Sequence, residues 1–506
     1  MLNYINLDLS QVKKCQISIP NIDNLLHQFK IQRILTRVGI SKVRGVAPIM
    51  IIFIFFVMTF NRRRSIAEGL KFMDVYKSKS AYYEFIDNPN YNWRKMLTQV
   101  SKDFVRQRAA DEGGYSTLLI DDTPKEKYGK KVEYISRFKN HLKGVTCTGY
   151  EVPFLAWTNG RSCIPLDFEL KIGSKLCKHA KIGEYEAGCH THDRIQDASL
   201  SKTEILIDFL KRALINGIPF DFVSWDSWYN CSQIYKYVYE ELVPQNIHLV
   251  TMIKQGRETY TYEKEKLTTK QLYVKAGEWK EMKIEKETDG GKTKLIKIKY
   301  KSLIIDLHDK THKSNQPFIG KAKIYFIQLP NHQRTNEYRI LLTTDLDMSI
   351  EKIIKIYSQR WQIEVMFRDL KQHLGFNQAK LSKYSAQIGD LTIRCIFYIM
   401  LCSCKDRAPT TKRQPTLFEI CGDFERHWVQ MLILCFGELM TMRVLRSLFR
   451  DNIEEDVKLI MDKAQIIFNE MYKPPIKKNE FVLGKESECK QFDELLFDLV
   501  IEKENI

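Results

Sequence analysis

Apolar residues are spaced differently in successive parts of the chain, and the spacing predicts where helices give way to strands. Residues 1 to about 110 place apolar side chains at mixed intervals of three and four, which indicates helices, with plausible examples over 28–40 and 65–76. The apolar run 46–58, VAPIMIIFIFFVM, is much shorter than the about 20 residues that a membrane span needs. It therefore predicts a buried helix within an N-terminal helical region.

From Tyr115 the period changes to strand-like alternation. The segment YSTLLID predicts a strand that runs into two acids, and residues 144–170 predict two or three more strands with a turn at Asn159-Gly160. The pattern then predicts a helix over 201–215, a strand over 220–225, a helix over 232–242 and a strand over 248–253. This order is typical of an α/β core of the RNase H-like type.

The predicted core is interrupted between residues 254 and 337. This segment is rich in Lys, alternates in polarity and is punctuated by Gly, which predicts antiparallel strands joined by exposed turns. The core resumes with YRILLTTDLDM, and residues 376–450 again look helical. A linker follows at KPPIKK, and the acidic, amphipathic end of the chain predicts either an oligomerisation helix or a frayed tail. The predicted regions are 1–110, 111–253, 254–337, 338–375 and 376–506.

The segment YSQRWQIEVMFRDLK carries the strongest chemical signal. Tyr357, Arg360, Glu364 and Lys371 are spaced by three, four and seven residues, and at about 100° per residue they fall within roughly 60° of one helical face. A carboxylate flanked by cations suits a metal-binding acid that lies against a phosphate backbone. The alternative is an amphipathic helix with a salt-bridged exposed face. The adjoining apolar stripe predicts docking on a core; it comprises Ile363, Met366, Phe367 and Leu370.

Two further acidic sites lie upstream. Asp121 and Asp122 end the first predicted strand, and Asp226 follows the strand of FVSWDSWYN. A carboxylate at the end of a strand is held rigidly while it faces solvent, as a metal ligand requires. Asp226 has the alternative role of capping the next helix, because Asp is a common N-cap residue. An RNase H-like fold would bring both sites together with Glu364.

The spacing Tyr-x2-Arg-x3-Glu-x6-Lys, within RWQIEVMFRDLKQHLGF, resembles the signature of DDE transposases of bacterial insertion sequences, in the insertion-sequence-four family. The resemblance covers roughly residues 115–375. It implies that Asp121, Asp226 and Glu364 are the catalytic acids. Relatives carry Asp-x-Thr or Asp-x-Ser at the first acid, which favours Asp121 over Asp122, although Asp122 stays open as the alternative.

The resemblance also implies a chemistry. Cut-and-paste transposition would use two Mg²⁺ ions, for which Mn²⁺ can substitute, with Asp121 bridging both ions and Asp226 and Glu364 each holding one. Tyr357, Arg360 and Lys371 would contact phosphates. The DNA substrates would be terminal inverted repeats and target DNA, residues 1–110 would recognise the element ends, and the protein would act as a homodimer.

Some relatives form a hairpin on the element end and stack a flipped base on an aromatic ring. Trp279, which is the only tryptophan of the 254–337 segment, is one hypothesis for that ring in this chain. Simple packing within the β-rich segment is the alternative.

Composition narrows the function classes. The 506 residues are enough for two to four domains, and 44% hydrophobic content excludes a disordered chain. A net charge of +17 indicates a polyanionic partner, with nucleic acid ahead of an acidic membrane. Two other functions stay open: an RNase H-like nuclease without strand transfer, and a decayed transposase that only binds DNA.

Twelve cysteines without a framework spacing, and no signal peptide, predict reduced thiols in a cytoplasmic protein. The resemblance implies a bacterial protein that is nucleoid-associated when bound to DNA. One group of Cys and His residues offers zinc ligands at no standard spacing, so coincidence is the main alternative. The group comprises Cys177, His179, Cys189, His190 and His192.

Overall fold

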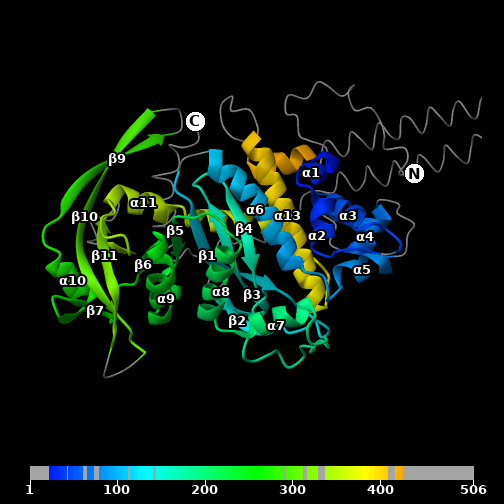
Figure 1. Ribbon diagram of the computed structural model, residues 1–506, viewed down its shortest axis with the longest axis horizontal. Coiled ribbons are helices and arrows are strands. Elements are labelled where there is room, and N and C mark those ends of the chain that lie inside the picture. The colour runs from blue at the N-terminus through cyan, green and yellow to red at the C-terminus, as the bar shows by residue number, and fades with distance from the viewer. Residues whose placement is uncertain are drawn as a thin grey trace, which may run out of the picture.

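The computed structural model describes residues 22–42, 44–60, 65–72, 79–111, 114–140, 144–288, 292–311, 316–328, 337–407 and 416–424. These residues form an elongated α/β molecule in which N-terminal helices lie at one end and β-strands at the other (Figure 1). The strands are β1 (Thr117–Glu126), β2 (Ser136–Asn140), β3 (Val145–Thr158), β4 (Cys163–Phe168), β5 (Phe222–Trp225), β6 (His248–Ile253), β7 (Thr259–Tyr262), β8 (Glu265–Thr268), β9 (Lys280–Thr288), β10 (Lys292–His308), β11 (Phe318–Gln328) and β12 (Arg339–Thr343).

The helices fall into an N-terminal set and a set that follows or interrupts the strands. The N-terminal set is α1 (Ile22–Gln28), α2 (Ile31–Arg37), α3 (Pro48–Phe60), α4 (Ile66–Phe72), α5 (Ser80–Ile86) and α6 (Trp93–Asp111). The later set is α7 (His190–Ser199), α8 (Lys202–Ile215), α9 (Ser232–Tyr237), α10 (Thr269–Lys275), α11 (Ile350–Ser358), α12 (Trp361–Gln372) and α13 (Tyr384–Arg407).

All twelve strands belong to one mixed sheet, in the order β2-β3-β1-β5-β6-β12-β11-β10-β7-β8, with β4 paired to β3 and β9 paired to β10. At its centre β1, β5 and β6 are parallel, whereas β3 and β12 flank them in the antiparallel sense. Parallel neighbours need long crossover connections. Here α7 and α8 connect β1 and its hairpins to β5, and α9 connects β5 to β6.

The predicted core elements are confirmed with one correction. The turn at Asn159-Gly160 joins β3 to β4, and α8 starts at a capping box between Ser201 and Glu204. The prediction that Asp121 and Asp122 end their strand is wrong, because β1 continues to Glu126. The antiparallel partner β3 pairs with β1 over its full length, whereas β5 pairs only as far as Ile120. The two acids thus follow the end of the parallel pairing, in the middle of the strand.

The 254–337 segment forms the predicted antiparallel strands, β7 to β11, and also one short helix, α10. Its strands do not form a separate layer. β12 pairs with β6, β11 pairs with β12, and β10 pairs with β11, so they continue the core sheet outward. Figure 1 shows this extension in green at the end of the molecule opposite the N-terminal helices.

The N-terminal residues that are described form only helices, as predicted, but the helix expected over 28–40 is broken. α1 ends at Gln28, and α2 starts after Lys30, whose φ of 51° is left-handed and interrupts the helix. The apolar run forms α3, which is largely buried, with Ile51 and Phe56 fully inside. The predictions for the linker and the terminal segment lie outside the described residues.

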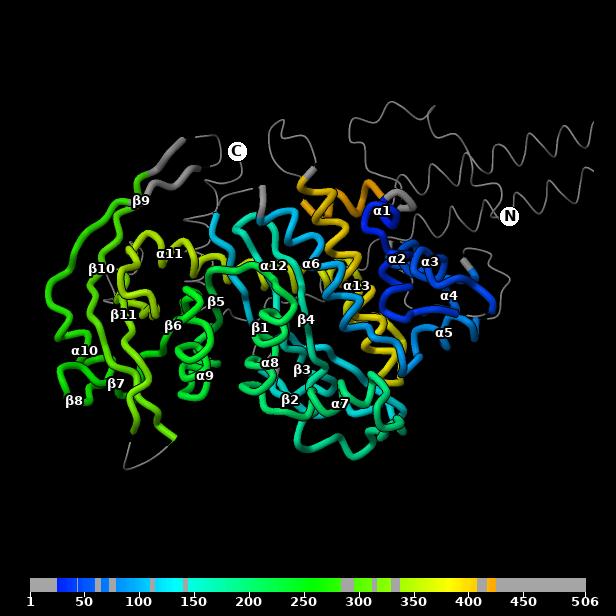
Figure 2. The backbone as a smooth tube through the Cα atoms, in the orientation of Figure 1, coloured from blue at the N-terminus to red at the C-terminus, as the bar shows by residue number. Residues whose placement is uncertain are grey.

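One helix, Tyr384–Asp406, is long and apolar enough to cross a membrane, but 89% of its apolar window is buried inside the protein. That burial is typical of a core helix. In Figure 2 the same helix, α13, runs beside α6, between the N-terminal helices and the strands.

Two buried lysines fasten the segment after α12 to β1. Side chains at alternate positions of a strand share a face, so Lys125 projects from β1 on the same side as Asp121, and Lys127 comes directly after the last residue of β1. The ammonium of Lys125 donates a hydrogen bond to the carbonyl oxygen of Phe376 and lies over the Phe376 ring, and Lys127 donates to the carbonyl oxygen of Ala379. These bonds fix the C-terminal end of α12 relative to the strand.

We expect Lys127 to make folding stability depend on pH. Burial lowers its pKa to about 8, helped by Arg394 and opposed by Asp390. The unfolded pKa is near 10.4, so the unfolded chain binds more protons between the two values, and stability rises with pH there. Relative to Lys127→Met, the wild-type free energy of unfolding should rise by about 2 kcal/mol between pH 7.5 and 9.5. Urea unfolding of both proteins at both pH values measures this change. If the difference in free energy of unfolding between wild type and Lys127→Met were the same at pH 7.5 and 9.5, the predicted effect of burial on Lys127 would be wrong.

Candidate active site

The register of the central sheet brings two acids together. The parallel pairing of β1 and β5 ends at Ile120 and Trp225, so Asp121 and Asp226 occupy the next equivalent positions on neighbouring strands. Side chains at equivalent positions of parallel strands point to the same face. Asp226 also caps the 3-10 turn Ser227–Tyr229 by accepting hydrogen bonds from the amide and hydroxyl of Ser227. Both interpretations of Asp226 from the sequence, acid site and cap, are therefore consistent with its position.

The third acid, Glu364, comes from α12, which packs along β1 and β4 (Figure 2). Two buried glutamines hold the start of this helix against the sheet. Gln359 accepts a hydrogen bond from Thr117 of β1 at 2.7 Å, and Gln362 accepts one from Thr158 of β3. Gln362 also donates to the carbonyl oxygen of Gly160. Neither glutamine was predicted from the sequence, although both lie beside the signature residues. A polar residue at the start of a helix gives no sign in the sequence that it is buried.

The prediction that the four signature residues share one helical face is wrong. The chain turns at Gln359 and Arg360, so Tyr357 belongs to α11 while Glu364 and Lys371 belong to α12. Tyr357 is completely buried in a core between α11 and the sheet. It therefore does not offer its ring to DNA in this structure. The predicted apolar stripe from Ile363 to Leu370 is buried, as expected.

Arg360 lies among the acids and is only 3% exposed. Its Nη2 donates a hydrogen bond to Oε1 of Glu364 at 2.8 Å, and its Nη1 lies 3.5 Å from Oδ2 of Asp121. One guanidinium thus links the acid of β1 to the acid of α12. The sequence predicted this cation at this site but assigned it to a DNA phosphate, whereas here it pairs with carboxylates.

The raised pKa of Asp121 also indicates that the acids lie close together. Burial raises the pKa of Asp121 to about 7, opposed by Arg360 and reinforced by the negative charges of Glu364, Asp122 and Asp226. Carboxylates that raise the pKa of one another are typical of sites that hold cations. The three predicted acids are therefore brought into one electrostatic group.

Asp122 faces the opposite side of β1 and belongs to a different network. It accepts hydrogen bonds from Lys202 at 2.6 Å and from the hydroxyl of Tyr229 at 3.1 Å. Lys202 also contacts Glu151 at 3.3 Å. With a cation and a phenol already bound, Asp122 fastens α8 and the turn after Asp226 to β1. The geometry therefore favours Asp121 as the acid that faces Glu364.

The donor chemistry of the site fits a hard divalent cation, because the converging groups are carboxylates and Mg²⁺ prefers oxygen ligands. Among the described residues no three His, Cys, Asp or Glu side chains stand close enough together to enclose a metal ion as they are. Arg360 contacts one oxygen of Asp121 and one of Glu364, so a cation at these carboxylates would compete with the guanidinium. The described Cys and His residues around α7 likewise form no such cluster, and Cys189 caps the helix by accepting a hydrogen bond from the His192 amide.

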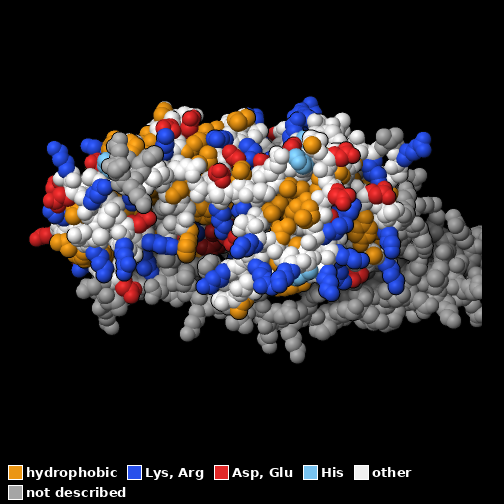
Figure 3. All heavy atoms as spheres, turned by 90° about the horizontal axis from the view of Figure 1, so that it is seen from below, with side chains coloured by type: hydrophobic (Ala, Val, Ile, Leu, Met, Phe, Trp, Pro, Cys, Tyr) orange, Lys and Arg blue, Asp and Glu red, His pale blue; other side chains and the backbone are white. Residues whose placement is uncertain are grey.

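Basic residues surround an acidic hollow on one face of the molecule. Figure 3 shows Asp and Glu side chains at the bottom of a hollow near the middle of this face, with Lys and Arg side chains on both sides. The view looks at the lower side of Figure 1, toward which α8 and α9 project. Such a charge pattern attracts a polyanion to the rim and leaves the acids for cations.

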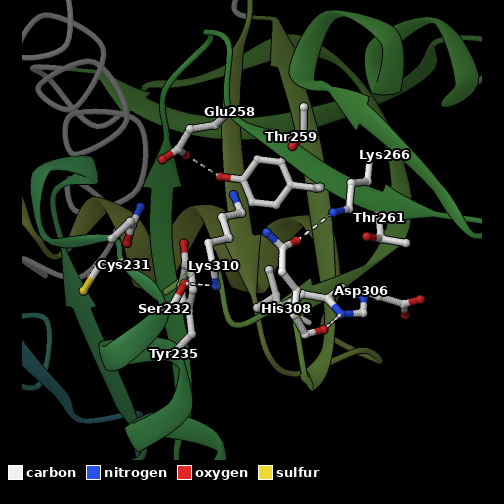
Figure 4. A pocket seen from close by; sticks show the side chains of 14 residues that line it. Cys231, Ser232, Tyr235, Glu258, Thr259, Thr261, Lys266, Asp306, His308 and Lys310 are labelled. Atoms are coloured by element: carbon white, nitrogen blue, oxygen red, sulfur yellow. Dashed lines mark hydrogen bonds between the residues drawn. The ribbon is translucent and has the colours of Figure 1, made fainter. Parts of the chain in front are cut away.

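A separate cavity of about 210 Å³ lies between α9 and the strands of the 254–337 segment (Figure 4). Ser232 accepts a hydrogen bond from the Lys310 amide across it, and the Tyr260 hydroxyl donates to Glu258 at 3.0 Å. None of the three acids lines this cavity. It therefore belongs to the junction between the core and the strand extension.

Trp279 lies in that extension and is half-buried. Its ring meets the Tyr273 ring edge-on at 5.8 Å, and the Lys301 ammonium lies 5.2 Å from it. These contacts favour the packing alternative over a role in base stacking.

The chain matches two family models. The model described as "DDE superfamily endonuclease" matches residues 52–289, which include Asp121 and Asp226, and "Transposase DDE domain" matches residues 186–400, which include Asp226 and Glu364. No curated protein is similar enough to the chain to count as a match. The two family matches support a transposase or endonuclease of the DDE type.

Replacing Arg360 should unmask the repulsion among the acids. In EDTA we expect Arg360→Gln to lower the free energy of unfolding by about 3 kcal/mol, because the buried carboxylates lose their cation. Added Mg²⁺ should recover part of this loss by binding the folded state. Arg368→Gln on the same helix is the control, since the Arg368 side chain is exposed and contacts none of the three acids in the structure; it pairs with its neighbour Asp369. Equal denaturation midpoints for the two variants would contradict the role of Arg360.

Proposed function

We propose that this DDE-type protein is a DNA transposase that moves an insertion sequence by a cut-and-paste route. The observation that carries the proposal is the convergence of Asp121, Asp226 and Glu364 from β1, β5 and α12 around Arg360. Matches to DDE endonuclease and transposase families over residues 52–400 support it. The net charge of +17 fits a DNA substrate.

We also propose that the catalytic core is RNase H-like and is interrupted by residues 254–337. The order β4-β3-β1-β5-β6, with β1, β5 and β6 parallel and β3 antiparallel to β1, supports this fold. In open sheets with parallel strands, ligands bind beyond the carboxyl ends of those strands. Asp121 and Asp226 directly follow the last paired residues of the parallel β1–β5 ladder, although β1 itself continues to Glu126.

The acids would hold divalent cations, with Asp121 between two Mg²⁺ ions and Asp226 and Glu364 each contacting one. Such ions activate water and offset charge on the leaving oxygen. The residues of the chain position the reacting groups: β1 and β5 fix the two aspartates, and α12 carries Glu364 to them. No side-chain nucleophile is needed, so the buried cysteines have no assigned chemical role.

Arg360 and Lys371 would contact the phosphates of the bound end. In the structure Arg360 pairs with Asp121 and Glu364. When cations and DNA bind, the cations would contact these carboxylates and the guanidinium of Arg360 would turn to a DNA phosphate. Lys371 lies two helical turns beyond Glu364 on α12. The burial of Tyr357 supports a packing role beneath these residues rather than a phosphate contact.

The proposal includes a homodimer that holds two element ends, with residues 1–110 recognising the terminal repeats. The alternatives are a nuclease without strand transfer and a DNA-binding remnant. The convergence of three acids weakens the remnant hypothesis. Joining a pre-cleaved element end to target DNA separates a transposase from a nuclease.

Removing one carboxylate should stop the chemistry and spare DNA binding. With Mg²⁺ and a labelled DNA fragment that carries the element's own end, Glu364→Gln and Asp121→Asn should lower cleavage by about a thousandfold or more, because each removes a metal ligand. Binding should be unchanged in a gel-shift assay. Cleavage by Glu364→Gln at the wild-type rate would refute the assignment.

Asp122→Asn is the matched control for Asp121→Asn. It should lower thermal stability, because Lys202 and Tyr229 lose a charged partner, yet retain cleavage at low temperature. The opposite result, with Asp122→Asn inactive and Asp121→Asn active, would exchange the two assignments.

A further inference from the structure

Arg360 lies inside the group of acids rather than at its rim. It comes directly before the first residue of α12, and its guanidinium contacts acids from two elements. Nη2 donates a hydrogen bond to Oε1 of Glu364 at 2.8 Å, and Nη1 lies 3.5 Å from Oδ2 of Asp121. The side chain is only 3% exposed. The guanidinium is therefore a buried internal cation, held by the acids of α12 and β1.

These two ion pairs engage the kind of oxygen atom that a divalent cation needs. Mg²⁺ binds carboxylate oxygens, and Arg360 contacts one such oxygen on Asp121 and one on Glu364. With these pairs in place, no three Asp, Glu, His or Cys side chains in the described part of the chain lie close enough to enclose a metal ion. Arg360 and a divalent cation are thus competitors for the same two carboxylates.

Displacing the guanidinium is costly unless it gains a new anion. Removing the partner of a buried ion pair leaves a charge that is neither paired nor fully hydrated, and Arg360 is too buried for water to replace both carboxylates. A phosphate can replace them, because a guanidinium binds phosphate in the same two-pronged geometry as it binds a carboxylate. Under the proposed function, the DNA backbone brings that phosphate to the acids.

We propose that Arg360 is an internal competitor that makes cation binding by the acids depend on DNA. Before DNA binds, the guanidinium holds Asp121 and Glu364; a phosphate of the bound DNA end then takes over the guanidinium and releases both carboxylates for divalent cations. The contact is thus autoinhibitory, since it keeps cations off the acids until DNA is present. By linkage, cations raise the affinity for DNA by the same factor as DNA raises the affinity for cations. This inference rests on the proposed function.

Competition by Arg360 can be separated from direct ligation of the cation by DNA. A DNA phosphate that itself bound the cation would also raise cation affinity, but it would leave the affinity of the protein alone independent of Arg360. Competition predicts that removing the guanidinium strengthens cation binding before any DNA is added. The direction of that change decides between the two.

The first measurement is Mn²⁺ binding to the full-length protein without DNA, followed by the electron paramagnetic resonance signal of the free ion. We expect Arg360→Gln to bind Mn²⁺ about tenfold more tightly than the wild type, which is within the range of typical coupling energies. Arg360→Lys keeps the charge but not the two-pronged geometry, so its affinity should lie between them. Arg368→Gln is the matched control, because it removes one positive charge from the same helix and contacts none of the three acids in the structure.

The second measurement adds a pre-cleaved DNA end, which has no bond left to be cut at the element boundary. The wild-type affinity for Mn²⁺ should rise by about tenfold, whereas Arg360→Gln should gain clearly less. Asp121→Asn with the same DNA measures the Mn²⁺ that the DNA itself binds. The wild-type comparison needs no variant, and circular dichroism in the titration buffer checks that Arg360→Gln is folded.

The outcomes separate the competition from the proposed function. Equal or weaker Mn²⁺ binding by Arg360→Gln without DNA would overturn the competition, and cleavage by the wild type would then leave the transposase proposal intact. Absence of wild-type cleavage would overturn the function, while tighter Mn²⁺ binding by Arg360→Gln would still establish the competition. An equal gain in Arg368→Gln would reduce the effect to general charge and refute a specific role of Arg360.

Discussion

Repulsion among carboxylates gathered at one point is the constraint that the rest of the structure satisfies. Asp121, Asp226 and Glu364 lie close enough for the charges of the other two to raise the pKa of Asp121, and one guanidinium, that of Arg360, offsets them. Such a group does not assemble by itself, because each added charge opposes the next. The surrounding elements must hold it, and their packing explains why α12 is fastened at both ends: buried glutamines bind its start, and Lys125 and Lys127 bind the segment after its end.

The hydrogen bonds that hold α12 are made by buried polar groups, so they fix this helix, whereas the contacts of Arg360 can change. Buried lysines and glutamines are costly unless bonded, so α12 is committed to one position on β1. Arg360 is different, since its two partners are the groups that a divalent cation would take. The contacts that can change are therefore those of one side chain, Arg360, while the backbone around it stays fixed. This division suits a site where cations and a phosphate arrive together, because only a guanidinium has to turn.

The sequence predicted the elements of the core well because apolar periodicity acts locally: the helix over 201–215, the strand over 248–253 and the buried apolar helix all follow from it. It failed where distant contacts decide. The spacing of Tyr357, Arg360 and Glu364 fits one helix, but the pairing of Gln359 with Thr117 accompanies a break between α11 and α12. Likewise β1 continues past its acids because β3, thirty residues away, pairs with its full length. Motif and strand order predicted the three acids that the structure brings into one electrostatic group, whereas Lys125 and Lys127 carry no local sign of their buried contacts.

The charge distribution links the acidic centre to the basic chain. A net charge of +17 attracts DNA at long range, but the acids would repel the phosphate that has to reach them. Within the site Arg360 offsets the charge of Asp121 and Glu364, with which it pairs. Further Lys and Arg side chains lie on both sides of the acidic hollow (Figure 3), so an approaching phosphate meets positive groups at the rim first. Under the proposed function, divalent cations would neutralise the carboxylates and Arg360 would be left to bind the DNA, so the acidic centre would change from a barrier into the place where the charge of the reacting phosphate is balanced.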